Sequence, residues 1–178
     1  MEISKKNIKF KKKKIRRKRK GTKNISETIR FLGVNSAGIR SKILTFKKVI
    51  KELNPSVFFV QETKLKEEGK IRIGDYVIFE KLRTTRTNGG GLAIGCKQEL
   101  NPIWVREGGE EVETLSIEIF VKQLRIRCCT GYGCQEGDLK EKKDAFWEYL
   151  DTEVLEAKKA ASGLIIQMDG NLWAESNH

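Results

Sequence analysis

Residues 57–64, VFFVQETK, decide the fold class of this 178-residue chain. The first half of the stretch is an apolar run of β-branched and aromatic residues, which predicts a buried strand. The second half is polar, so Gln61 and Glu62 stand where that strand ends. Strand ends converge at the carboxyl edge of a sheet, and polar residues there are candidates for binding or catalysis.

A strand and a helix are predicted immediately before this stretch. Residues 29–34 read as a strand, and apolar residues then recur at helical spacing at Ile43, Phe46, Ile50 and Leu53. Ser41 is predicted to cap the helix and Asn54-Pro55 to end it. The order strand, helix, strand predicts a parallel pair with the helix packed across it.

Further strands are predicted toward the middle of the chain. Short extended pieces cover residues 76–79 and 91–94. Strict alternation of apolar and polar residues over 115–121 and 124–128 predicts a hairpin that turns at Lys122-Gln123.

A second helix is predicted over residues 139–158. Its apolar face is expected to contain Phe146, Leu150, Val154 and Leu155. The helix leads into a strand over residues 164–168, so the chain as a whole has the pattern of an α/β domain.

The excess positive charge is confined to one end of the chain. Residues 1–24 hold 13 of the 36 Lys and Arg and a single acid, whereas the other 154 residues carry 23 basic and 23 acidic side chains. So polar a segment is predicted to be a disordered basic arm, with the folded domain over residues 25–178. The arm would bind the phosphate backbone of a nucleic acid, act as a nuclear-import signal, or have no specific role. Its candidate nucleic-acid-binding residues are Lys12, Lys13, Arg16, Arg17, Lys18 and Arg19.

The cysteines favour a reduced, intracellular protein. The chain has four cysteines, and no apolar stretch follows its charged N-terminal region as a secretion signal would require. Cys128 and Cys129 are poor zinc ligands as a pair because neighbouring strand residues point to opposite faces. No run approaches membrane-spanning length.

Four short polar islands each follow an apolar, strand-like run. They contain Asn35, Glu62, Tyr132, and Asp169 with Asn171. Taken singly, each island has a purely structural explanation, as an ordinary loop residue, a helix cap or a tight turn. The ordered set instead favours one cluster of carboxylate, amide and phenol groups at a sheet edge.

Such a cluster suits a cation and a phosphate. A carboxylate such as Glu62 at the end of a buried strand is costly unless it is paired or binds a cation, and Mg²⁺ usually takes one or two carboxylates. Asp169 could orient or deprotonate a water molecule. Asn35, Tyr132 and Asn171 could donate to phosphate oxygens. These roles describe phosphodiester hydrolysis.

These islands resemble the endonuclease/exonuclease/phosphatase superfamily, which includes the apurinic-site endonucleases. The resemblance covers about residues 29–175, and the final stretch is most similar to the endonuclease domain that precedes reverse transcriptase in non-LTR retrotransposons. The matching stretches are GVNSAGIR at 33–40, VQETK at 60–64, GGGLA at 89–93, TGYG at 130–133 and MDGNLWA at 168–174.

The resemblance implies a four-layer α/β sandwich and a role for each matching residue. Glu62 would hold Mg²⁺, or Mn²⁺ as a substitute, with Asn35 beside it. Tyr132 would contact the scissile phosphate, Asp169 would activate water, and Asn171 would hold the phosphate. The implied substrate is DNA, with a backbone-contacting loop that carries Arg83, Arg86 and Asn88.

The resemblance also implies that part of the site is missing. Family members continue to a late Ser-Asp-His block, whereas this chain has Ser176-Asn177-His178 only seven residues after Asp169. We therefore expect a C-terminally truncated domain with an incomplete second sheet and impaired activity. The resemblance also implies a nuclear protein that derives from a retroelement, with a reverse transcriptase domain in its full-length relative. The alternatives are a non-enzymatic nucleic-acid-binding fragment that acts through the basic arm, and a phosphoesterase of the same superfamily.

Overall fold

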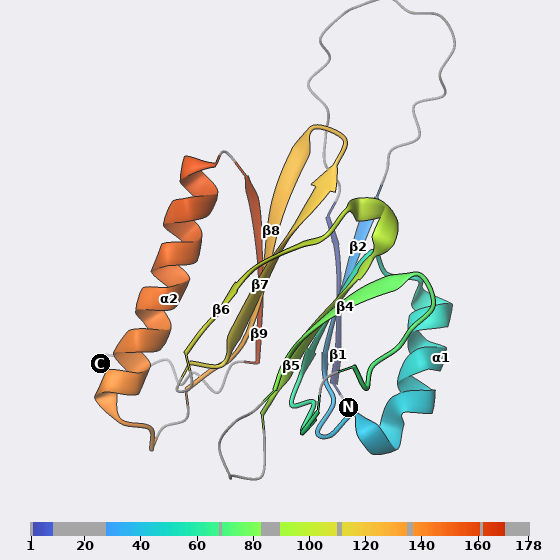
Figure 1. The fold of residues 1–178 in the computed structure, drawn as a ribbon, viewed down its shortest axis with the longest axis horizontal. Helices are drawn as coiled ribbons and strands as arrows, with labels where there is room; N and C mark the ends of the chain where they lie inside the picture. The colour runs from blue at the N-terminus through green and yellow to red at the C-terminus, as the bar shows by residue number, and fades with distance from the viewer. Residues whose placement is uncertain are drawn as a thin grey trace, which may run out of the picture.

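Two β-sheets face each other in the centre of the molecule. The computed structural model describes residues 2–8, 28–67, 69–82, 90–109, 112–134, 137–160 and 162–169. Within these residues the first sheet has the strand order β1-β2-β3-β5-β4 and the second has the order β6-β7-β8-β9 (Figure 1). The strands of the first sheet are β1 (Glu2–Ile8), β2 (Ile29–Asn35), β3 (Val57–Gln61), β4 (Tyr76–Lys81) and β5 (Leu92–Lys97). Those of the second are β6 (Ile103–Glu107), β7 (Thr114–Val121), β8 (Leu124–Tyr132) and β9 (Gly163–Asp169).

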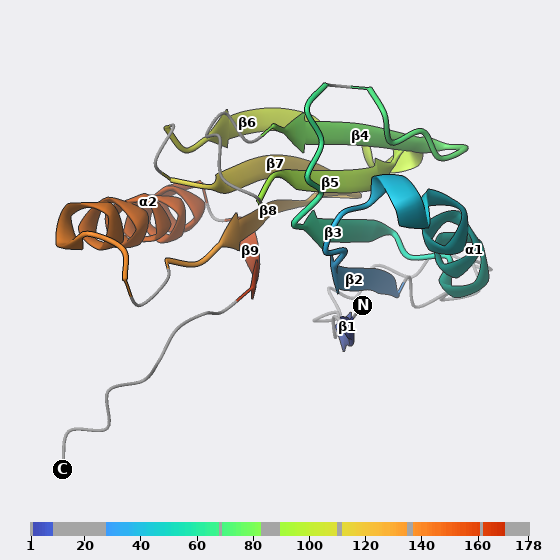
Figure 2. The ribbon, with the colours of Figure 1, turned by 90° about the horizontal axis from the view of Figure 1, so that it is seen from below.

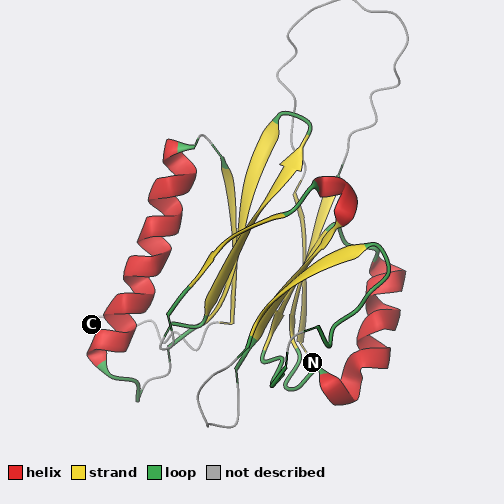
Figure 3. Ribbon diagram, viewed as in Figure 1, coloured by secondary structure: helices red, strands yellow, loops and turns green. Residues whose placement is uncertain are grey.

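Two helices cover the outer faces of the sheets. Helix α1 (Ile43–Leu53) lies on the first sheet and α2 (Lys140–Lys159) on the second, so helix, sheet, sheet and helix form four layers (Figures 2 and 3). Short 3₁₀ turns occupy Arg40–Lys42 and Gln98–Leu100. The predicted four-layer α/β sandwich is confirmed. Among the residues that the structure describes, neither helix is both long and apolar enough to span a membrane.

The predicted strand pairings are present. Strands β2 and β3 are parallel with α1 between them in sequence, and β7 and β8 form the predicted antiparallel hairpin, closed by the pair Val121 and Leu124. Strand β9 follows α2 and pairs with β8 in parallel, which gives each sheet one strand, helix, strand unit. Strand β6 was not predicted. It is an edge strand whose residues are exposed or half-buried, so its sequence lacks the signal of a buried strand.

Strand β3 is apolar throughout because both of its faces are buried. Val57 and Phe59 face the second sheet, where they pack with Leu115 and Ile117, whereas Phe58 and Val60 face α1 with Phe46. Alternate residues of a strand point to opposite faces, so a strand between two apolar layers has no polar side. The stretch that began the sequence analysis therefore lies at the centre of the fold.

Helix α2 buries a face that agrees only in part with the one predicted. Its buried residues are Phe146, Leu150, Glu153 and Ala157, whereas Leu155 is 54% exposed. The prediction was wrong at Leu155, and it missed Glu153, a charged residue that is completely buried; Val154 is half-buried.

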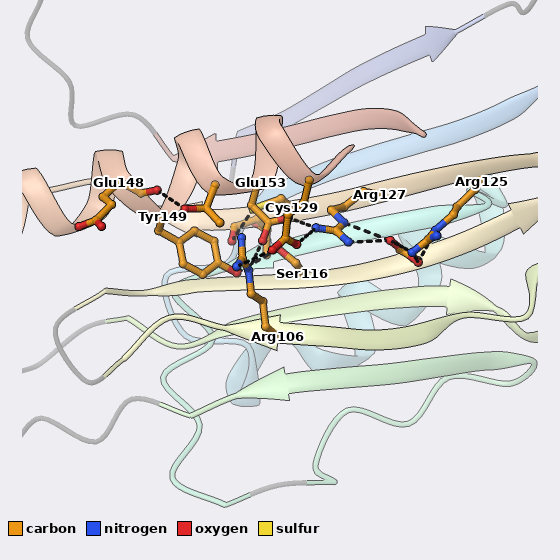
Figure 4. A network of polar contacts seen from close by, with 12 residues as sticks. Arg106, Ser116, Arg125, Arg127, Cys129, Glu148, Tyr149 and Glu153 are labelled. Carbon is orange, nitrogen blue, oxygen red and sulfur yellow. Dashed lines mark hydrogen bonds and ion pairs between the residues drawn. The ribbon is translucent and has the colours of Figure 1, made fainter. Parts of the chain in front are cut away.

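An ionic network holds Glu153 against the second sheet. Glu153 accepts hydrogen bonds from Arg106 of β6 and Arg127 of β8, and Arg127 also binds Glu118 of β7 at 2.8 Å and Glu156 at 2.6 Å (Figure 4). Burial acts to lower the pKa of Arg127, but its bonds to Glu156 and Glu118 outweigh that effect and raise the pKa overall. The arginine therefore stays charged, and α2 is attached to its sheet by charge as well as by apolar contact.

Two local predictions near the N-terminal part of the chain need correction. Residues 2–8 form strand β1, which pairs antiparallel with β2 from Glu2 opposite Asn35 to Ile8 opposite Ile29, so the prediction of disorder was wrong for this segment. The free edge of β2 supplies backbone partners that an isolated arm lacks. Ser41 lies inside the 3₁₀ turn, and α1 begins without a side-chain cap.

Candidate active site

The ends of four strands bring the predicted site residues to one edge of the sandwich. Asn35 is the last residue of β2, and Glu62 follows β3 directly. Tyr132 and Asp169 are the last residues of β8 and β9, and they are paired across the second sheet. Because β2 runs parallel to β3, and β8 parallel to β9, each sheet contributes two adjacent strand ends.

The four side chains form one hydrogen-bonded group. The Asn35 Nδ2 atom donates to Glu62 Oε1 at 3.0 Å and also to Asp169 Oδ2, which lies 134 positions away in sequence. The Tyr132 hydroxyl donates to Glu62 Oε1 at 3.4 Å. The Glu62 side chain is 19% exposed, so the group is largely shielded but still reachable from solvent. Residues from both sheets thus meet around the Glu62 carboxylate.

Backbone contacts fix the direction of the Glu62 side chain. Glu62 has a φ of 51°, in the left-handed region that costs a residue with a side chain roughly 1–2 kcal/mol. Its carbonyl oxygen accepts from Gly38 N and from the hydroxyl of buried Ser36, both at 2.8 Å. The next residue, Thr63, donates its N–H to the Gly91 carbonyl at 3.0 Å. These bonds hold a strained conformation, as is common at functional sites.

Sequence reasoning assigned no role to three further residues beside the site. Lys64 Nζ lies 3.8 Å from Glu62 Oε2, and its side chain is 41% exposed. Gln61 and Thr130 are buried and bonded to each other between the two sheets. Lys64 and Gln61 lie within the QETK stretch, so their positions were visible in the sequence, but the pairing of Gln61 with Thr130 was not.

The donor set fits a hard cation. Two carboxylates, Glu62 and Asp169, contact the same Asn35 amide nitrogen, and their mutual repulsion would fall if a divalent ion lay between or beside them. One or two carboxylates with water is the usual protein contribution to Mg²⁺ binding. The Asn35 amide oxygen accepts from Ala37 N at 2.9 Å, so Asn35 turns its NH₂ group to the carboxylates. Among the described residues there is no group of three or more His, Cys, Asp or Glu side chains arranged to hold a metal ion.

Cys96, Cys128 and Cys129 lie in the packed interior of the molecule. Cys128 belongs to the core between the sheets and Cys129 to the cluster beneath α2, so these neighbours face opposite sides of β8 as predicted. Burial raises the pKa of Cys96 and of Cys129 to about 12. A thiol that resists ionisation is a poor metal ligand and a poor nucleophile.

Several predicted residues lie outside the part of the chain that the structure describes. They are Asn171, the loop residues Arg83, Arg86 and Asn88, and the basic residues Lys12, Lys13, Arg16, Arg17, Lys18 and Arg19. Their roles stay predictions, as does the division between a basic segment and a domain over residues 25–178.

Comparisons with known proteins give matches in structure alone. No family model matches the sequence, and no curated protein matches it. The AP endonuclease LMAP from Leishmania major is 18% identical with a TM-score of 0.67, over 78% of this chain and 54% of that one. The catalytic domain of Xenopus laevis APE2 is 20% identical with a TM-score of 0.61, over 80% and 58%.

The human Nocturnin catalytic domain is 13% identical with a TM-score of 0.58, over 81% of this chain and 65% of that one. The chain thus spans little more than half the length of the Leishmania and Xenopus structures. Likeness at these identities establishes the fold. Over its described residues, the chain has the same two-sheet, four-layer α/β fold as these solved structures.

Proposed function

We propose that the site around Glu62 hydrolyses phosphodiester bonds in DNA with the help of a divalent cation. One observation carries the proposal: the Asn35 amide joins the carboxylates of Glu62 and Asp169 from different sheets, with the Tyr132 hydroxyl on Glu62. The structural neighbours support it, since the Leishmania major structure is named as an AP endonuclease.

Each residue of the group has a distinct chemical role in this proposal. Glu62, with Asn35 beside it, would hold Mg²⁺ or Mn²⁺, which supplies positive charge to the phosphate. Asp169 orients and deprotonates the attacking water, and its bond from Asn35 fixes its position at the edge of the second sheet. Tyr132 donates to a phosphate oxygen that gains charge in the transition state, and Asn171 assists it.

Polynucleotide is a better substrate class than a small phosphoester. Residues 1–24 carry the whole excess of positive charge, which favours attraction to a phosphate backbone. The same basic run, as an import signal, would place the protein in the nucleus. The MDGNLWA stretch supports an origin in a retroelement whose full-length relative carries a reverse transcriptase domain.

The 178-residue polypeptide is expected to cleave DNA slowly. Its single histidine, His178, lies outside the described residues, so the site as described contains no imidazole to act as a further acid, base or electrophile. Loss of a positioned acid, base or electrophilic group typically costs about a hundredfold in rate or more.

Nicking of supercoiled plasmid and of an abasic-site duplex in Mg²⁺ and in Mn²⁺ tests the proposal. We expect slow nicking that is abolished by a chelator and by Glu62→Gln. Glu67→Gln is the matched control because its carboxylate is 71% exposed and lies outside the site. Equal nicking by the native chain and Glu62→Gln would refute the assignment.

The charge distribution also favours a second candidate, a non-enzymatic nucleic-acid-binding protein. Deletion of residues 1–24 would remove β1 together with the basic run, so we suggest changing Arg16, Arg17, Lys18 and Arg19 to Gln instead. In a salt titration the log–log slope should become less steep by about 0.9 for each phosphate that the variant no longer neutralises. The non-enzymatic, nucleic-acid-binding function is favoured by two results together. The variant with four Gln substitutions must lose binding, and Glu62→Gln must change neither binding nor nicking.

A further inference from the structure

A buried polar contact joins the two sheets directly behind the candidate site. Gln61 Nε2 of β3 donates to Thr130 Oγ1 of β8 at 2.9 Å, and to the Gln167 carbonyl of β9 at 3.4 Å. Gln61 is 2% exposed and Thr130 is fully buried. The Gln61 amide therefore connects the first sheet with two strands of the second.

Every strand in this contact also carries a site residue. Gln61 directly precedes Glu62, Thr130 lies two residues before Tyr132, and Gln167 lies two residues before Asp169. Residues two apart on a strand share a face, so Thr130 and Gln167 lie on the same faces as the site residues that follow them. A shift of β8 or β9 relative to β3 would therefore move Tyr132 or Asp169 relative to Glu62.

The fourth strand of the site, β2, contributes to this contact because its residue Gly33 has no side chain. Gly33 lies two residues before Asn35, and a Cβ atom added there would lie 2.6 Å from Cδ of Gln167. The Gln167 side chain thus occupies space that Gly33 leaves free between the sheets. Strands β2 and β9, which carry Asn35 and Asp169, are in close contact at this level.

Most of the interior between the sheets is apolar, with Phe59, Ile94, Ile117 and Cys128 among its buried residues. Apolar packing is non-directional and tolerates small shifts. A buried hydrogen bond has a narrow range of distance and angle, and leaving it unmade exposes each partner to its full desolvation cost. The buried Gln61 contact can therefore help to define the register of the two sheets, in addition to the bonds of Asn35 to Asp169 and of Tyr132 to Glu62 at the edge.

We propose that Gln61 and Thr130 are positioning residues that set the distance between the two halves of the site. Their bond holds β8 and β9 where Asp169 and Tyr132 reach Asn35 and Glu62. Only the consequence for catalysis rests on the proposed function, because the effect on geometry holds whatever reaction the site performs.

Thr130→Val tests the proposal, since it keeps the shape of the side chain and removes the hydroxyl. The reporter is the side-chain amide of Asn35 in ¹⁵N-edited NMR spectra, because its Nδ2 atom contacts carboxylates from both sheets. We expect the Asn35 signal to shift and lose its protection from solvent exchange in Thr130→Val. Thr130→Ser, which restores the hydroxyl, should return the signal toward its native position.

Tyr149→Phe is the matched control. Its hydroxyl pairs with Ser116 at 3.1 Å in the cluster between the second sheet and α2, on the far side of that sheet from the interface. This variant also loses one partly buried hydrogen bond, and it should leave the Asn35 amide unchanged. Gln61→Met provides a second route if Thr130→Val does not fold. An unshifted, still protected Asn35 amide in a folded Thr130→Val or Gln61→Met protein would overturn the proposal.

Nicking assays on the same variants separate this proposal from the proposed function. Misplacement by about 1 Å can cost a hundredfold in rate, so we expect a fall of that order in Thr130→Val, mainly in kcat and with recovery in Thr130→Ser. If the native chain shows no nicking but the Asn35 amide moves as expected, the nuclease assignment fails and the positioning role stands. If nicking depends on Glu62 and Thr130→Val leaves both readouts unchanged, the positioning role fails alone.

Discussion

Gly91 and Thr63 meet directly behind Glu62, and their contact constrains the turn that carries the carboxylate. Gly91 has a φ of 82°, and a Cβ atom added to it would lie 2.5 Å from Thr63 Oγ1. Gly69 has a similar φ of 70°, but an added Cβ atom there meets nothing within 4 Å. The two glycines therefore share the backbone requirement and differ in the space around them.

Gly91→Ala is expected to destabilise the protein more than Gly69→Ala. The left-handed backbone alone should cost about 1–2 kcal/mol in either variant, and Gly91→Ala adds the contact with Thr63. Urea denaturation of the two variants measures the difference. Equal losses would show that the turn behind Glu62 relaxes freely, contrary to the packing described above.

The buried thiols predict a loss of stability in alkali. The pKa of Cys96 and of Cys129 is raised to about 12 in the folded protein, against about 8.5 for an exposed thiol. Between these values the unfolded chain releases protons that the native state retains, so the stabilisation present below the unfolded pKa is lost as pH rises. At about pH 10 the expected loss is roughly 2 kcal/mol for each thiol. Urea midpoints measured as a function of pH should fall less steeply in Cys96→Ala, and an unchanged slope would contradict the assignment.

At the scale of elements, α2 is unusual because a charged residue occupies the centre of its buried face. Glu153 is fully buried between Arg106 and Arg127, and Arg127 also binds Glu118 (Figure 4). With Arg125 and Glu156, which pair with Glu118 and Arg127, four strand residues and two helix residues share one ionic network. Such a network is costly to desolvate, but it specifies one orientation of the helix, because an apolar face alone would permit rotation.

Glu153→Ala is expected to destabilise the protein by about 1–3 kcal/mol, because Arg106 and Arg127 each lose a buried hydrogen-bond partner but keep Glu156, and Arg127 also keeps Glu118. Glu148→Ala is the control on the same helix, since Glu148 is exposed. Thermal unfolding followed by circular dichroism compares the two variants. A similar midpoint for both would mean that solvent reaches Arg106 and Arg127 once Glu153 is gone.

At the scale of the whole molecule, the candidate site joins the two sheets at one edge. Asn35 and Glu62 belong to the first sheet, whereas Tyr132 and Asp169 belong to the second. A cation bound by Glu62 and Asp169 would therefore link the two halves of the sandwich, and binding to the native state alone raises its stability.

Saturating Mn²⁺ is expected to raise the unfolding temperature of the native protein. At a hundred times the dissociation constant the added stability is about 2.7 kcal/mol. The rise should disappear in Glu62→Gln and persist in Glu67→Gln, which alters an exposed carboxylate. Differential scanning calorimetry in Mn²⁺ and in a chelator measures the effect. An equal rise in all three proteins would locate the ion elsewhere.

The sequence by itself determined the elements in which the pattern of apolar and polar residues shows which faces are buried. The apolar run of β3, the alternation in β7 and β8 and the helical spacing of α1 are local patterns, and each predicted element is present. The positions of Asn35, Glu62, Tyr132 and Asp169 at strand ends follow from the same patterns. Edge strand β6 was missed because an exposed or half-exposed strand requires no apolar periodicity, and edge strand β1 was missed because it lies in a highly charged segment.

Only the tertiary structure decided which distant groups meet. The bond of Asn35 to Asp169 spans 134 positions, and the bond of Gln61 to Thr130 spans 69. The burial of Glu153 on α2 depends on arginines from two strands, β6 and β8. Periodicity records whether a residue faces an apolar layer, which is a property of its own segment. The partner of a buried polar group lies on another segment, and the sequence pattern of neither segment identifies the other.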